Sequence, residues 1–190
     1  MAIDGGDGAR ATVRALIEAD ELRMAALSAV ADLALPDGWI GAGFVRDAVW
    51  DHLHGRSGAP PAGDTDVLWF DAEAVDEAVD RALEEKLRAA LPCFGWSVKN
   101  QARMHVRNGD APYVSVADAM TRWPETATAV AARLVAGGVE ISAPLGLDDL
   151  FAMRLRPTIS FTGRKHAIFR QRLASKRWVE RYPMLTIVRP

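Results

Sequence analysis

The chain has 190 residues, 49% of them hydrophobic, and a formal net charge of −2. This length and apolar content suffice for one buried core without disulfides or a structural metal, and the single cysteine, Cys93, excludes an intrachain disulfide framework and fits a reducing compartment. No export signal opens the sequence and no apolar run approaches the roughly 18 residues of a membrane span, so we expect a cytoplasmic protein without a membrane partner. We expect one domain over residues 1–190, with residues 1–8 disordered.

Charge is distributed unevenly along the chain. Residues 1–90 contain 8 Lys/Arg and 18 Asp/Glu, whereas residues 91–190 contain 15 and 7. A basic half can mark a surface that binds a polyanion, and it can also neutralise the acidic half across a contact inside one domain. We favour the second interpretation, so a nucleic-acid partner is a secondary hypothesis.

In the first half of the chain, apolar residues recur at three- and four-residue steps in segments that end at Pro or Gly. This pattern is typical of amphipathic helices, and the short β-prone runs between them indicate strands. The predicted elements are a helix over 9–35, a strand at 39–40, a helix over 44–54, a strand beginning at 64 and a charged helix over 73–91.

In the second half, residues 96–106 alternate between polar and apolar side chains, which predicts a half-buried strand; Asn100 is the single break in the apolar set. Gly137-Gly138 predicts a hairpin turn between two further strands. The other predicted elements are a helix over 114–122, strands over 126–135 and 139–142, a short helix over 146–153, a strand over 154–158 and a basic helix over 163–182. Together they indicate an α+β fold, a mixed β-sheet flanked by helices.

Two aspartates stand at the head of the strand Asp64-Thr-Asp-Val-Leu-Trp-Phe70. Side chains two residues apart on a strand point to the same face, so Asp64 and Asp66 can converge on one point. Paired carboxylates suit a hard cation such as Mg²⁺ or Mn²⁺, which prefers oxygen ligands and substrate phosphates. Solvated residues at a strand start are the plainer alternative, and we favour metal binding by both aspartates because a glycine turn precedes them by one helix.

That turn, Gly41-Ala42-Gly43, opens the helix that begins at Phe44. A helix start with small residues offers a phosphate close backbone approach, unpaired N–H groups and the positive end of the helix dipole. The guanidinium of Arg46 can add a bidentate phosphate contact, or it can pair with a nearby acid. Lys99 on the polar face of the strand over 96–106 is a further candidate for nucleotide binding.

The Gly41-Ala-Gly-Phe-Val-Arg-Asp47 segment followed by Asp64-x-Asp66 resembles the head motif of the DNA polymerase β-type nucleotidyltransferases, and is especially similar to tRNA CCA-adding and poly(A) polymerase heads. Further segments, 98–105, 123–129 and 143–151, resemble a small bacterial group of nucleotidyltransferase-like proteins. The resemblance implies a palm-type core. The family carries Gly-Gly or Gly-Ser where this chain has Gly41-Ala42.

The resemblance also implies a third carboxylate on a later strand, but the polar face of 97–105 carries none. Asp118, Glu125 and Glu140 are the candidates, and we prefer Asp118 because it lies near a family-like segment. The leading hypothesis is a magnesium-dependent transferase that moves a nucleoside monophosphate from an NTP to a hydroxyl of a small molecule or protein. The alternatives are a nucleotide-binding module without activity and an RNA-associated protein that uses the basic helix over 163–182.

Overall fold

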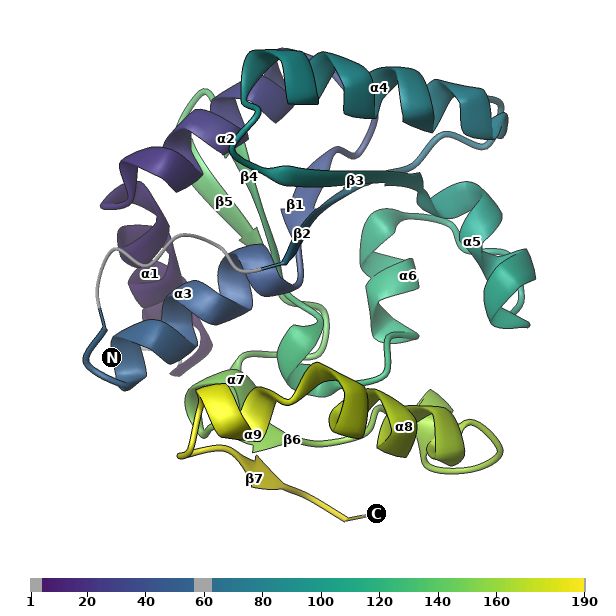
Figure 1. Ribbon diagram of the computed structural model, residues 1–190. Helices are drawn as coiled ribbons and strands as arrows, with labels where there is room; N and C mark the ends of the chain where they lie inside the picture. Colours follow the sequence, from purple (N-terminus) through teal and green to yellow (C-terminus); the bar gives the residue numbers. More distant parts are fainter. Residues whose placement is uncertain (1–4, 57–62, 190) are drawn as a thin grey trace.

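The computed structural model describes residues 5–56 and 63–189, and its centre is a five-stranded sheet (Figure 1). The strand order is β3-β2-β1-β4-β5; β2 and β3 are parallel and every other neighbouring pair is antiparallel. The sheet is therefore mixed, and the predicted α+β class is confirmed. The strands are β1 (Trp39–Gly41), β2 (Asp64–Trp69), β3 (Gly95–Asn100), β4 (Ala131–Val135) and β5 (Gly138–Ser142).

Four helices cover one face of the sheet: α1 (Gly5–Glu18), α2 (Glu21–Ala31), α3 (Gly43–Leu53) and α4 (Glu77–Ala90). Val67 and Trp69 of β2 and Val98 of β3 point into this larger core, because alternate strand residues face the same side. Leu83 and Leu87 of the charged helix α4 pack against it.

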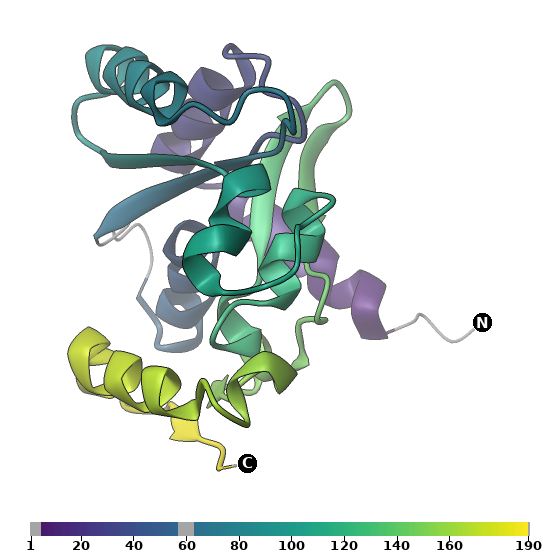
Figure 2. The same cartoon turned by 90° about the vertical axis from the view of Figure 1, so that its right-hand side faces the viewer.

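The opposite face of the sheet carries a second, smaller core. Leu68 of β2 and Trp39 of β1 pack there against Val116 and Met120 of α6 (Val116–Thr121). The C-terminal part of the chain lies near the end of the sheet where β2 begins (Figures 1 and 2), and its buried residues, such as Leu150, Trp178 and Tyr182, belong to the larger core. It contains η1 (Thr126–Thr128), α7 (Asp148–Phe151), β6 (Arg154–Leu155), η2 (Ile159–Phe161), α8 (His166–Lys176), α9 (Trp178–Arg181) and β7 (Thr186–Ile187).

The prediction of one strand over 96–106 is wrong beyond residue 100. β3 ends at Asn100, whose side chain accepts the N–H of Ala102 and begins helix α5 (Gln101–Asn108). An N-cap of this kind satisfies a first-turn donor and starts a helix regardless of the pattern that follows. Asn100, the one residue that broke the alternation, was the signal for this boundary.

Two long predicted helices are each divided. Asp20 caps α2 by accepting the N–H of Arg23, which separates α2 from α1 within the predicted helix over 9–35. Arg177 adopts a left-handed backbone with φ 50° and separates α8 from α9 within the predicted helix over 163–182.

Other boundaries also differ. Helix α1 begins at Gly5, within the segment we expected to be disordered, while residues 1–4 lie outside the described part. The strand expected to begin at 126 begins only at 131, because 126–128 form the 3-10 turn η1. Of the helices described here, none combines the length and the hydropathy that crossing a membrane demands.

Candidate functional site

Asp64 and Asp66 occupy the first and third positions of β2, on the face that carries the smaller core. The strand register places Gly41 opposite Asp66 on one side and Ser97 on the other, with Gly95 beside Asp64. All three of these neighbours have small side chains or none. The two aspartates share a face, as alternate residues of a strand must.

Charges of both signs act on the pKa of Asp66. Burial raises the pKa of Asp66, and the adjacent negative charge of Asp64 raises it further. Three cations oppose this and lower it, in the order Lys176, Arg172 and Arg46. A cation bound between the carboxylates would relieve the repulsion that Asp64 exerts on Asp66.

The glycine turn connects β1 to α3 beside these carboxylates. Ala42 has φ 52° and ψ −121°, a conformation that normally selects glycine, and its N–H donates to the carbonyl of Val130 at 2.9 Å. The Ala42 N–H is therefore already used within the fold. Among the described residues, the N–H groups of Gly43 and Phe44 find no acceptor, as expected for the first turn of a helix.

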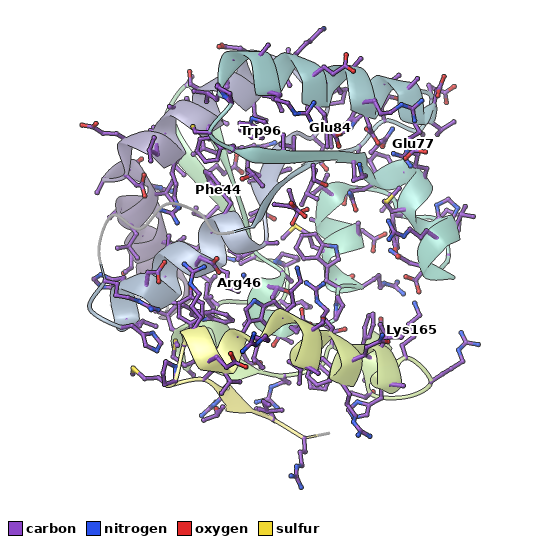
Figure 3. The ribbon with its side chains drawn as sticks, viewed as in Figure 1. Phe44, Arg46, Glu77, Glu84, Trp96 and Lys165 are labelled. Carbon is purple, nitrogen blue, oxygen red and sulfur yellow. The ribbon has the colours of Figure 1, made fainter. Side chains whose placement is uncertain are left out.

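Arg46 lies inside the protein, between α3 and the C-terminal helices (Figure 3). Its guanidinium donates to Asp47 Oδ1 from Nε at 2.9 Å and from Nη2 at 2.6 Å, and it lies over the rings of Trp50 and Trp178. A Cβ built on Gly43 would lie 3.2 Å from Arg46 Nη2, so the guanidinium sits directly beside the glycine turn. The ion pair considered for Arg46 is formed with Asp47, while its phosphate contact stays a prediction.

Two other predicted site residues, Lys99 and Asp118, are bonded to neighbouring groups of the fold. Lys99 of β3 donates to Glu84 of α4 at 3.0 Å, and Glu84 also accepts the N–H of Val98 (Figure 3 labels Glu84). Asp118 accepts the N–H of Val114 at 3.1 Å, while its own N–H donates to the Ser115 hydroxyl. This reciprocal pattern resembles a capping box at the start of α6 and gives Asp118 a structural role.

The structure adds cations from α8 that the sequence did not assign to this site. Arg172 and Lys176 lie one helical turn apart, and both act on Asp66. Arg172 bonds the buried carboxylate of Glu125 at 2.9 Å. Their four-residue spacing on a basic helix was visible in the sequence, but nothing local indicated which element that face would meet.

The donor set near Asp66 fits a magnesium-type cation held partly by its substrate. No group of three or more His, Cys, Asp or Glu side chains able to hold a metal occurs in residues 5–56 and 63–189. Magnesium is commonly bound through one or two carboxylates together with waters and substrate phosphates, so Asp64 and Asp66 suffice for that arrangement.

Comparison with known proteins identifies the chain. The profile of a family described as nucleotidyltransferase matches residues 28–187. The chain belongs to this nucleotidyltransferase family. No curated protein matches the sequence.

Two solved structures are similar to this chain. An NMR structure reported to reveal a CCA-adding enzyme head domain is 33% identical, with a TM-score of 0.84 over 94% of this chain and 95% of that one. A tRNA-processing enzyme complex is 19% identical with a TM-score of 0.50, and shares the fold over 86% of this chain but only 43% of that one. The predicted resemblance to polymerase β-type nucleotidyltransferases and to CCA-adding heads is confirmed.

Proposed function

We propose that this protein transfers a nucleoside monophosphate from an NTP to a hydroxyl group of an acceptor, with a divalent cation, Mg²⁺ or Mn²⁺, at Asp64 and Asp66. The observation that carries the proposal is the convergence of these two carboxylates on one face, beside a glycine turn and within the field of three cations. Family membership supports the NTP as substrate. The acceptor, a small molecule or a protein, is named only by its hydroxyl.

We assign the acidic groups of the site to the cation and its basic and N–H groups to the phosphates. Asp64 and Asp66 would hold the cation, and Arg46 beside Gly43 adds positive charge next to the turn. The N–H groups of Gly43 and Phe44 are the donors available to a phosphate, while Gly41 and Ala42 shape the turn that presents them. Positioning and charge stabilisation of this kind account for most of catalysis in phosphoryl transfer.

The divalent cation would neutralise charge on the phosphates as the bond to the leaving pyrophosphate breaks. Close carboxylates resist ionising together, and the raised pKa of Asp66, caused by burial and by Asp64, is the expected condition of a cation site before loading.

We keep Asp118 as the proposed third carboxylate. Its hydrogen bond from the N–H of Val114 supports a different, structural role, which is to cap helix α6. Asp118→Asn separates the two. Loss of transfer with nucleotide binding retained supports the catalytic role, whereas a lower melting temperature with normal transfer assigns Asp118 to capping α6. Lys99 is likewise proposed as a nucleotide contact that must first leave Glu84.

The test is a thermal-shift panel of the four NTPs with and without magnesium. A ligand at one hundred times its dissociation constant adds about 2.7 kcal/mol to the free energy of unfolding, which is readily visible. We expect magnesium-dependent stabilisation in the wild type and its loss in Asp64→Asn/Asp66→Asn. The control, Glu85→Gln on α4, removes one carboxylate of an exposed residue elsewhere and should behave as the wild type.

A second candidate is a nucleotide-binding protein without transferase activity. This candidate is favoured because two possible third carboxylates already have partners in the fold. Asp118 accepts a backbone N–H, and Glu125 is paired with Arg172. Incorporation of labelled nucleotide into any acceptor would exclude it, and magnesium-dependent NTP binding with no transfer across acceptor classes would favour it.

A further inference from the structure

The carboxylate of Glu125 is fully buried and makes polar bonds through both oxygens. Its Oε1 accepts from Arg172 Nε at 2.9 Å and its Oε2 accepts from the Thr128 hydroxyl at 3.0 Å. Burial raises the pKa of this group, and the charge of Arg172 opposes that effect. A fully buried carboxylate is costly unless it is paired, so this arrangement holds the guanidinium in one place.

Only part of the Arg172 guanidinium is used by Glu125. The bond engages Nε, and the side chain remains 33% exposed. Its position is further defined by the ring of Trp178, whose centroid lies 5.4 Å away. The remaining N–H donors are therefore held in a fixed orientation, the state in which arginine binds a phosphate at least entropic cost.

Lys176 lies on the same face of α8, one turn further along. It makes no ion pair with any residue of the described ranges, while Phe169 is buried and seats the helix on the body of the protein. In both views the C-terminal half of α8 lies beneath the beginning of β2, where Asp64 and Asp66 stand (Figures 1 and 2). Arg170 is exposed and, two residues before Arg172, points to the other side of the helix.

An ordinary solvated helix face does not require a buried carboxylate to orient one of its arginines. We propose that Arg172 and Lys176 bind the triphosphate of the NTP held at Asp64 and Asp66, and that Glu125 is the positioning residue that orients Arg172. This inference rests on the proposed function and adds to it the residues that distinguish a triphosphate from a monophosphate.

The test measures binding by calorimetry, with inorganic triphosphate plus magnesium as one probe and inorganic monophosphate plus magnesium as the other. Loss of one charge-assisted hydrogen bond should weaken triphosphate binding about tenfold or more in Arg172→Gln and in Lys176→Gln. Monophosphate binding should change far less. Arg170→Gln removes the same charge from the same helix and should match the wild type.

The role of Glu125 is tested by a double-mutant cycle. Glu125→Leu should weaken triphosphate binding, and adding it to Arg172→Gln should produce no further loss, because both changes remove the same oriented donor. Should Glu125→Leu fail to fold, Arg172→Lys carries this test. It keeps the charge but lacks the planar fork that Glu125 orients through Nε, and should bind nearly as weakly as Arg172→Gln. Wild-type affinity in Arg172→Lys would overturn the role of Glu125.

Three results separate this inference from the proposed function. Equal triphosphate affinity in Arg172→Gln, Lys176→Gln and Arg170→Gln, with dependence on Asp64 and Asp66 retained, would overturn only the inference. Unchanged triphosphate binding together with lost binding of an RNA oligonucleotide would assign these cations to a polyanionic partner and also overturn it. A wild type that binds neither triphosphate nor any NTP would overturn both.

Discussion

Gly41 of β1 is paired directly with Asp66 of β2 across two antiparallel strands. A Cβ built on Gly41 would lie 2.7 Å from Leu68 Cδ1 and 3.2 Å from the Trp123 ring. The close fit leaves no room for a side chain at position 41. Because Gly41 has none, the glycine turn can lie directly beside the start of β2, which carries the two aspartates.

We therefore expect Gly41→Val to destabilise the protein by about 1–3 kcal/mol, as overpacking a filled site does. The shift of Leu68 should also displace β2 and weaken magnesium-dependent NTP binding. Thermal unfolding and the NTP shift measure the two effects. Gly137→Val is the matched control, because a Cβ there meets nothing within 4 Å; equal losses in both variants would contradict the steric explanation.

Ala42 adopts φ 52°, in the left-handed region that favours glycine. Non-glycine residues in such conformations store roughly 1–3 kcal/mol of strain, while glycine costs about 0.4–1 kcal/mol through the unfolded state. Ala42→Gly should thus leave stability unchanged or raise it. Ala48→Gly, inside α3, should lower stability by about 1 kcal/mol. Chemical denaturation compares them, and a clear loss in Ala42→Gly would show that the turn is unstrained.

Both tyrosines are predicted to titrate above the usual range near 10. Burial raises the pKa of Tyr113 to about 12, and Asp110, which accepts its hydroxyl proton, also raises it. Burial raises the pKa of Tyr182 too, followed by the charges of Asp47 and Asp51. Ultraviolet titration of phenolate should therefore show no native ionisation near pH 10.

The sign of the stability effect follows from these directions. Tyrosine in the unfolded chain ionises near pH 10, before the folded protein does, so the stability contributed by neutral Tyr113 is complete below pH 10 and is lost as pH rises toward about 12. Tyr113→Phe should reduce the slope of unfolding free energy against pH in this window. An unchanged slope would contradict the assigned shift.

Asn100 should be among the most sensitive polar positions. Its side chain accepts the N–H groups of Asp71 and Ala102 and donates to the carbonyls of Asp71 and Ala74, all within a buried site. Asn100→Ala should cost about 2–4 kcal/mol, because several buried backbone groups lose their partners. Asn108→Ala, at the exposed end of α5, removes one bond to Tyr113 and should cost far less. Denaturant unfolding measures both.

The site was partly readable from the chain itself. Asp64 and Asp66 are two residues apart in a β-prone run, and that period alone places them on one face. Gly41 and Gly43 likewise marked a turn into a helix, and α3 begins there. The β4–β5 hairpin at Gly138, where φ is 112°, followed from the same local chemistry.

Other features of the fold depended on contacts between residues far apart in the sequence. Whether residues 101–108 continue a strand or begin a helix depended on Asn100, whose amide is held by Asp71 and Ala74, far away along the chain. The pairing of Arg172 with Glu125 joins residues 47 positions apart in the chain. Periodicity determines which side chains share a face, but the element that packs against that face depends on the whole chain. For this reason the sequence alone determined the pair Asp64 and Asp66. Only the tertiary structure determined which cations act on that pair.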